Sequence, residues 1–153
     1  GLVFDPGVVP GISNEQLATG KFVVLTPPGL EFDGRDALSI NDLAGHPFIS
    51  LDRRGPLGRL LSKHFQSSRI KLNTVAYAET YQVAKSLVAH GAGITVADEI
   101  TARSSGHENV RVWPLLPELT FRISALHSEN SPMSLITLNF MKYLKQSVTA
   151  YVS

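Results

Sequence analysis

The chain has 153 residues, of which 43% are hydrophobic and 18% charged, and its formal net charge is +1. This composition excludes an intrinsically disordered chain and lacks the basic footprint expected of a segment that binds nucleic acid. The absence of cysteine excludes disulfides and thiol chemistry and fits a cytoplasmic protein. No apolar run approaches the roughly 20 residues of a membrane-spanning helix, so we expect no membrane partner.

The first half of the chain alternates short apolar runs with turn residues. Runs that end at Pro, Gly or Asp predict strands over residues 1–4, 21–26, 47–51 and 71–77. Ser39 followed by Asp42 has the spacing of a capping box and predicts a short helix that ends near Ala44. The pair Gly55-Pro56 predicts the start of a second helix that runs to about Gln66, because proline is favoured at the first helical position.

The second half continues the alternation. Thr80 is the predicted N-cap of a helix closed by Gly91, with an inner face made of Val83, Ala84, Leu87 and Val88. Further strands are expected at 93–97, 109–113 and 119–126, with a helical turn at 98–103. Ser131-Pro132 predicts the start of a last helix over 131–151, in which the apolar positions are Met133, Ile136, Phe140, Tyr143, Leu144 and Val148.

Strands that alternate with helices predict an α/β fold with a mainly parallel sheet and helices on both faces. The runs VVLT, FISL and GITVA have few polar interruptions, which is typical of strands buried on both sides.

Two strand-to-helix turns, at residues 51–58 and 78–81, are the candidate site. In such a sheet a ligand binds beyond the carboxyl ends of the strands, where each helix N-terminus carries roughly +0.5 charge. Arg53 or Arg54 could clamp a carboxylate there. The alternative is that both arginines are solvated loop residues and that Thr80 is only a helix cap.

Two acidic residues could complement such a carboxylate site. Glu79 and Asp5 are candidate partners for an ammonium or guanidinium group, which favours a zwitterionic, amino-acid-like effector.

The patterns of other chemistries are missing. The five histidines show neither HxH nor HExxH spacing, so no metal site is predicted. No serine lies in a GxSxG motif. Gly91 and Gly93 do not form a dinucleotide fingerprint, because Val96 takes the third glycine position and the glycines precede a strand. We therefore expect no catalytic machinery and no cofactor.

Three segments carry a family resemblance: GLVFDPGVVPGISNEQLATGKFVVLTPPG, LSINDLAGHPFISL and SLVAHGAGITVADEI. Together they resemble the effector-binding domain of LysR-type transcriptional regulators over the whole chain. The resemblance implies a fold like the type 2 periplasmic binding proteins, with two α/β lobes and a small-molecule effector between them. It also implies homo-oligomers (dimer or tetramer) in the cytoplasm, and promoter DNA bound only through an N-terminal winged helix-turn-helix that this sequence does not contain.

The resemblance divides the chain and assigns the site. Residues 19–122 correspond to a complete second lobe, while 1–18 and 123–153 correspond to parts of the first. Effector contacts carried over by position are Phe4, Asp5, Ser50, Arg53, Arg54, Pro56, Leu57, Glu79 and Thr80. The last helix would lack the part of the first lobe that it normally packs against and would expose an apolar face, which favours self-association.

The predicted function is ligand sensing by a LysR-type regulator, passed allosterically to DNA-binding domains. One alternative is the solute-binding protein of a transporter, which has the same architecture. The other is a small enzyme on this fold, similar to prephenate dehydratases or deaminases. That enzyme would need an acid/base pair in the cleft, and Asp5 with Glu79 is the only candidate pair.

Overall fold

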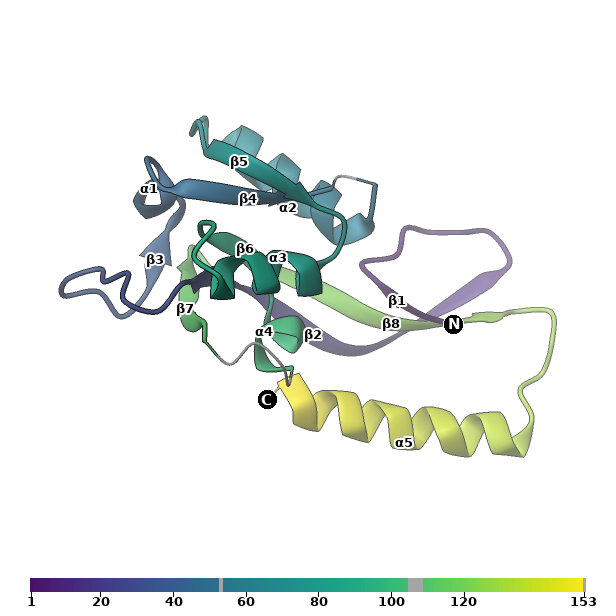
Figure 1. The fold of residues 1–153 in the computed structure, drawn as a ribbon. Coiled ribbons are helices and arrows are strands. Elements are labelled where there is room, and N and C mark those ends of the chain that lie inside the picture. The colour runs from purple at the N-terminus through teal and green to yellow at the C-terminus, as the bar shows by residue number, and fades with distance from the viewer. Residues whose placement is uncertain (53, 105–108, 153) are drawn as a thin grey trace. The chain divides into compact units, whose positions relative to one another are not determined.

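The computed structural model describes residues 1–52, 54–104 and 109–152 (Figure 1). The chain divides into two compact units. The first unit comprises Gly1–Gly20 and Thr120–Ser153, and the second unit comprises Lys21–Leu119. In the described residues, no helix combines the length and apolar character needed to cross a bilayer.

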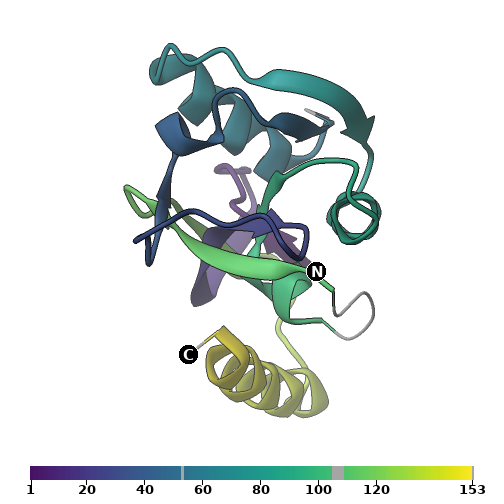
Figure 2. The same cartoon turned by 60° about the vertical axis from the view of Figure 1, so that its left-hand side comes forward.

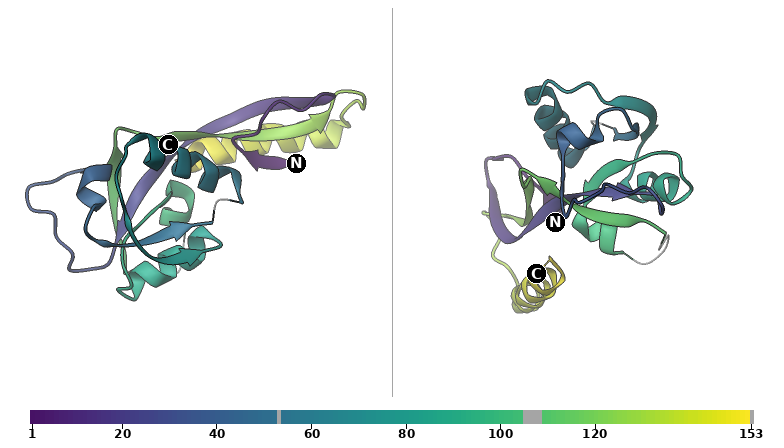
Figure 3. Two further views of the ribbon diagram at one scale, coloured as in Figure 1. Left: turned by 90° about the horizontal axis from the view of Figure 1, so that it is seen from above. Right: turned by 90° about the vertical axis from the view of Figure 1, so that its left-hand side faces the viewer.

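The first unit contains β1 (Leu2–Phe4), β8 (Thr120–Ser128), the beginning of β2 (Ile12–Thr26) and the long helix α5 (Leu135–Val152). Strand β1 pairs antiparallel with β8, and β8 also neighbours β2. Figure 3 shows α5 running alongside these strands, where its Thr149 hydroxyl donates a 3.4 Å hydrogen bond to the Leu17 carbonyl of β2.

The second unit is organised around the far half of β2. Here β2 pairs antiparallel with β6 (Thr95–Asp98) on one edge and with β7 (Arg111–Leu116) on the other. The two-residue strand β3 (Leu38–Ser39) runs parallel to β7. A separate parallel pair joins β4 (Pro47–Leu51) to β5 (Asn73–Ala78), and a parallel bridge from Phe48 to Ile94 links it to the chain before β6.

Four helices complete the second unit: α1 (Ile40–Leu43), α2 (Pro56–Ser67), α3 (Tyr81–Ala89) and α4 (Glu99–Arg103). Figure 2 views α3 nearly end-on. Helix α2 packs on the β4–β5 pair through an edge-to-face contact of the Phe48 and Phe65 rings, whose centroids are 5.7 Å apart. The apolar side chains on the inner faces of these strands and helices are almost fully buried and form the core of this unit.

Local capping explains where three of these helices begin. The Ser39 amide and hydroxyl donate hydrogen bonds of 2.8 and 2.7 Å to the Asp42 carboxylate, as its spacing predicted. The Thr80 hydroxyl accepts from the Val83 amide at the start of α3. The Asp98 carboxylate accepts from Thr101 at the start of α4. In each case a side-chain oxygen accepts from a backbone amide that the helix itself leaves without a partner.

The expectation of a mainly parallel sheet is wrong. Both neighbours of β2 in the second unit run antiparallel to it, and within the described residues only β3–β7 and β4–β5 are parallel pairs. The alternation of strands and helices fixes the class but not the direction of each strand. An apolar run is also equally suited to any central strand covered on both sides, whether parallel or antiparallel.

Three element predictions also need correction. Strand β2 begins at Ile12 rather than at residue 21, since its polar first half lacks the apolar run used to find it. Helix α5 begins at Leu135 rather than near Ser131, because the Ser134 hydroxyl accepts from the Thr137 amide and caps it there. On α3, Ala84 and Val88 are buried as predicted, but Val83 is exposed and Leu87 half-buried, and Tyr81 and Lys85 complete the buried face.

Candidate functional site

The parallel pairing of β4 and β5 brings the two predicted turns together. Leu51 at the end of β4 lies opposite Ala78 at the end of β5. The backbone amide of Asp52, the residue after Leu51, donates a 3.0 Å hydrogen bond to the Ala78 carbonyl. Parallel strands end at the same edge, so the turns into α2 and α3 start side by side.

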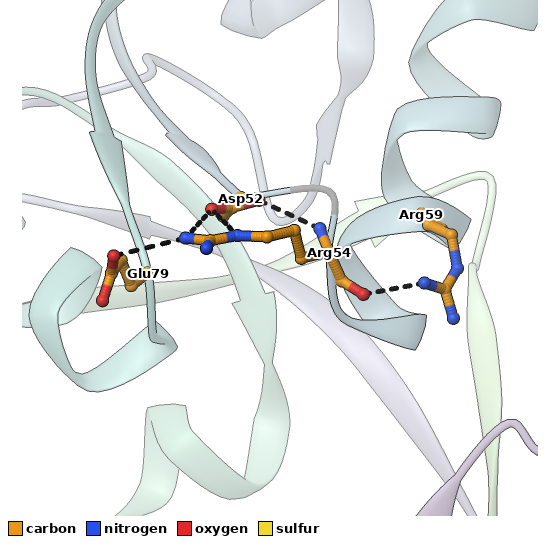
Figure 4. A network of polar contacts seen from close by, with 4 residues as sticks. All are labelled: Asp52, Arg54, Arg59 and Glu79. Atoms are coloured by element: carbon orange, nitrogen blue, oxygen red, sulfur yellow. Dashed lines mark hydrogen bonds and ion pairs between the residues drawn. The ribbon is translucent and has the colours of Figure 1, made fainter.

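An ion-pair network joins the two turns (Figure 4). The Arg54 guanidinium contacts the Asp52 carboxylate through Nη2 at 2.6 Å and Nε at 2.7 Å. The same Nη2 reaches Glu79 Oε1 on the other turn at 3.3 Å. The Arg54 and Glu79 side chains are 78% and 82% exposed, so both can exchange partners with a solute.

The electrostatics keep this cluster charged. Hydrogen bonds from Arg54 hold the pKa of Asp52 below its ordinary value of 3.8, and the Asp52 and Glu79 carboxylates raise the pKa of Arg54. The guanidinium therefore stays positive while two anions compete for it. A ligand carboxylate can replace one of them without a change of protonation.

The helix starts at these turns are also held by side chains. The Arg59 guanidinium, one turn into α2, donates a 2.7 Å hydrogen bond to the Arg54 carbonyl and fixes that loop (Figure 4). On α3 the Thr80 hydroxyl is engaged as the N-cap. In the first turn of α3 the Val83 amide is thus taken by Thr80, and Pro56 at the first position of α2 has no amide hydrogen to donate.

The remaining predicted site residues of the second unit have different surroundings. Pro56 is exposed at the first position of α2, whereas Leu57 is buried in the core at 5% exposure. Ser50 is half-buried and lines a cavity under α2. Arg53 lies outside the described residues. Within the second unit, the structure thus brings Arg54, Glu79 and Thr80 to one edge.

Phe4 and Asp5 lie in the first unit. The Phe4 ring packs edge-to-face on Phe121 with centroids 5.7 Å apart. Asp5 adopts a φ of 43°, and its carboxylate accepts from Arg122 Nε at 3.2 Å. The Asp5 carboxylate therefore already has a cationic partner in its own unit.

Sequence reasoning missed two polar residues of the second unit. Asp52 is the main anchor of Arg54, and its place directly after β4 was the available signal. Lys85 is buried and its ammonium donates to the carbonyls of Thr101, Ala102 and Ser104 at 2.8–3.2 Å. This contact satisfies the end of α4, and no periodicity could reveal a lysine on the inner face of α3.

Among the described residues, no three His, Asp or Glu side chains are grouped so that they could hold a metal ion. The Tyr81 hydroxyl is buried without a hydrogen-bond partner, and burial raises its pKa above the ordinary value of 10.0. A phenol held neutral in the core does not act as a base.

Comparisons with known proteins identify the family. Residues 1–149 match the family described as LysR substrate binding domain. The HTH-type transcriptional regulator DgcR of Pseudoalteromonas sp. is 31% identical over 147 residues, which are 96% of this chain and 50% of that protein. The transcriptional activator protein LysR of Escherichia coli (strain K12) is 22% identical over 143 residues, which are 94% of this chain and 46% of that protein. The chain thus spans about half the length of these two curated relatives, and both are named as transcription regulators, in agreement with a non-enzymatic function.

Solved structures share the fold. The CcmR regulatory domain of Synechocystis PCC6803, in complex with 2-PG, superposes with a TM-score of 0.81 at 18% identity, over 95% of this chain and 71% of that one. The effector-binding domain of QuiR, in complex with shikimate, gives a TM-score of 0.75 at 20% identity, over 97% and 73%. With the family match over nearly its whole length, the chain belongs to the LysR substrate-binding domain family.

Proposed function

We propose that this chain is the effector-sensing part of a LysR-type transcription regulator and that it acts in the cytoplasm. It binds a small metabolite and passes that binding to DNA-binding domains outside the residues described. The family match and the regulator relatives support this role. The CcmR and QuiR domains hold 2-PG and shikimate, both small polar molecules, which supports the same class of ligand here.

The observation that carries the proposal is the Arg54–Glu79 ion pair between two strand-to-helix turns. It places a cation and an anion at one exposed edge, beside two helix starts that favour anions. The proposed effector contacts on this edge are Arg54, Glu79 and Thr80. The family resemblance adds Ser50, Arg53, Pro56 and Leu57, and Phe4 and Asp5 of the first unit, as further proposed contacts.

The charges favour an amino-acid-like effector. A ligand carboxylate replaces Glu79 on the Arg54 guanidinium, and a ligand ammonium binds the Glu79 carboxylate so released. Asp52 stays on Arg54 and keeps the guanidinium oriented through its 2.7 Å bond. A simple dicarboxylate would leave Glu79 unpaired and bind less well.

The same proposal assigns the lobes and the transmission. Residues 19–122 form the second lobe, and 1–18 with 123–153 belong to the first. Effector binds one arrangement of the lobes more tightly and shifts its population, with a coupling of about 1–3 kcal/mol between ligand and DNA.

Self-association follows from the exposed apolar side chains of α5. No residue of this helix is buried, and Leu135, Ile136, Phe140 and Tyr143 are more than half exposed. A second copy that covers them would remove apolar surface from water. Sedimentation velocity of Ile136→Asp should show dissociation, while Asn139→Asp, with the same charge on the same helix, should not. A monomeric unmodified chain at high concentration would contradict this step.

The test of the sensor role is a thermal-shift screen of amino acids, opines and small carboxylates. A ligand at 100 times its Kd raises the stability by about 2.7 kcal/mol. Arg54→Ala and Glu79→Gln should each weaken the response, while Arg35→Ala, which removes an arginine paired only with Asp42, should not. A response that survives both site variants would place the effector elsewhere.

A further inference from the structure

A cavity of about 260 Å³ lies in the second unit, between α2 and the strands β4 and β5. Among the described residues that were predicted to contact the effector in this unit, only Ser50 lines it, and Arg54, Pro56, Leu57, Glu79 and Thr80 do not. It is therefore a feature separate from the ion-pair network of Figure 4. Its other walls come from α2 and from the segment 70–72 that leads into β5.

Several residues of the cavity lining are apolar and closely packed. Phe48 and Leu61 are 2% and 4% exposed, and Phe65 meets Phe48 edge-to-face at an interplanar angle of 88°. Aromatic rings fixed in this way favour a further ring placed on their free edges or faces. The lining thus suits the apolar body of a small molecule.

Other residues of the lining supply hydrogen-bond donors and a positive charge. The side chains of Ser50, Ser62 and Lys71 line the cavity, and in the described part of the chain none of them forms a hydrogen bond or ion pair with protein. None of the described lining residues is acidic. Lys71 is exposed, so its ammonium can reach an anion at the opening.

We propose that this cavity is a second ligand site, for a small monocarboxylic acid with an aromatic or branched aliphatic body. Its volume is below the roughly 300–1,000 Å³ of sites for drug-sized ligands, so the body is limited to about one ring. The ring lies against Phe48, Phe65 and Leu61. The carboxylate accepts hydrogen bonds from the serine hydroxyls and pairs with Lys71.

The test uses phenylacetate, with phenylacetamide as an uncharged molecule of the same shape. Two-dimensional amide NMR of the 153-residue chain should show saturable shifts with phenylacetate up to about 10 mM, confined to α2, β4, β5 and the segment 70–72. The amide should bind about five to ten times more weakly, because it lacks the charge that Lys71 recognises.

Matched variants locate the ligand. Ser62→Phe fills the cavity and should abolish the shifts. Lys71→Met should give the acid and the amide equal affinity, while Lys63→Met, which changes a lysine of α2 outside the lining, should change nothing. Arg54→Ala should also leave phenylacetate binding intact, which separates this site from the proposed effector site.

Several results would overturn the inference. They are the absence of saturable shifts, shifts centred on the turns near Arg54 and Glu79, or equal affinity for acid and amide in the unmodified chain. Should Ser62→Phe fail to fold, the Lys71→Met and Lys63→Met pair decides the question alone.

Discussion

Helices α2 in the second unit and α5 in the first unit both carry leucines at helical spacing, but they differ in burial. In α2, Leu57 and Leu61 are 5% and 4% exposed. In α5 no residue is buried, and Leu135 and Ile136 are 79% and 82% exposed. An apolar stripe therefore indicates that a helix tends to pack against another element, while only the structure shows whether such an element is present. The predictions below test this difference and then the finer contrasts within the second unit.

The largest contrast compares the same change in the two helices. Leu61→Ala should lower the free energy of unfolding by about 2–5 kcal/mol, because it removes buried methyl groups and enlarges the cavity under α2. Leu135→Ala should change it by less than about 0.5 kcal/mol. Urea unfolding followed by circular dichroism measures both. Equal losses would mean that α5 is covered in solution, which would itself support self-association.

A second contrast concerns two glycines of the second unit. Gly93 has a φ of 154°, and an added Cβ would collide with the Pro47 carbonyl, which already accepts a 2.8 Å hydrogen bond from Ile94. Gly93→Ala should therefore cost about 2–4 kcal/mol through overpacking and strain. Gly45 has a φ of 86° but open space around it, so Gly45→Ala should cost only about 1–2 kcal/mol. Thermal unfolding ranks the two, and the reverse order would contradict the close approach at Gly93.

A third contrast compares two aspartates. Ser39 hydrogen bonds hold the pKa of Asp42 below its ordinary value of 3.8, whereas Asp36 is exposed and has no such partner in the described residues. Asp42→Ala should cost about 1 kcal/mol at pH 7, as for other lost caps. Asp36→Ala should cost almost nothing.

The pH dependence of Asp42 has a definite sign. The pKa of the Asp42 carboxyl group is lower in the folded than in the unfolded chain. The ionised carboxylate therefore stabilises the fold fully above pH 3.8, and this stabilisation is lost as the pH falls through the pKa of the folded state. The difference in unfolding free energy between Asp42→Ala and the unmodified chain should shrink below pH 4. A constant difference down to pH 2 would show that the capping charge is irrelevant.

Local signals made part of this fold predictable. Four helix starts could be located from the sequence alone, because each depends on residues no more than three positions apart. They are marked by Ser39 with Asp42, by Pro56, by Thr80 and by Asp98. The first half of β2 was missed because its residues are mostly polar, and the direction of β6 and β7 was missed because it depends on partners distant in the chain.

In the candidate site, too, the features set by neighbouring residues could be predicted and those set by tertiary packing could not. The turns at Arg54 and Thr80 could be predicted, since each follows a recognisable strand. The cavity beneath α2 could not, because it arises from how α2 packs on β4 and β5. Asp52, which orients Arg54 from two residues away, was missed although its place directly after β4 was an available signal. Lys85 shows the same limit, since its carbonyl partners lie 16–19 residues further along the chain.

Glu79 has the largest proposed effect on ligand binding, although its substitution should change the stability very little. Glu79 and Arg54 form an exposed ion pair at 3.3 Å, and such pairs contribute about 0–1 kcal/mol. Glu79→Gln should therefore unfold within about 0.5 kcal/mol of the unmodified chain. An amino-acid effector should nevertheless bind this variant at least about tenfold more weakly, because the ammonium loses its charged partner. A dicarboxylate should gain affinity in the same variant, since the anion that competes for Arg54 is gone. Parallel titrations of both ligands thus distinguish a zwitterion site, where the two affinities move in opposite directions, from a simple anion site, where both rise.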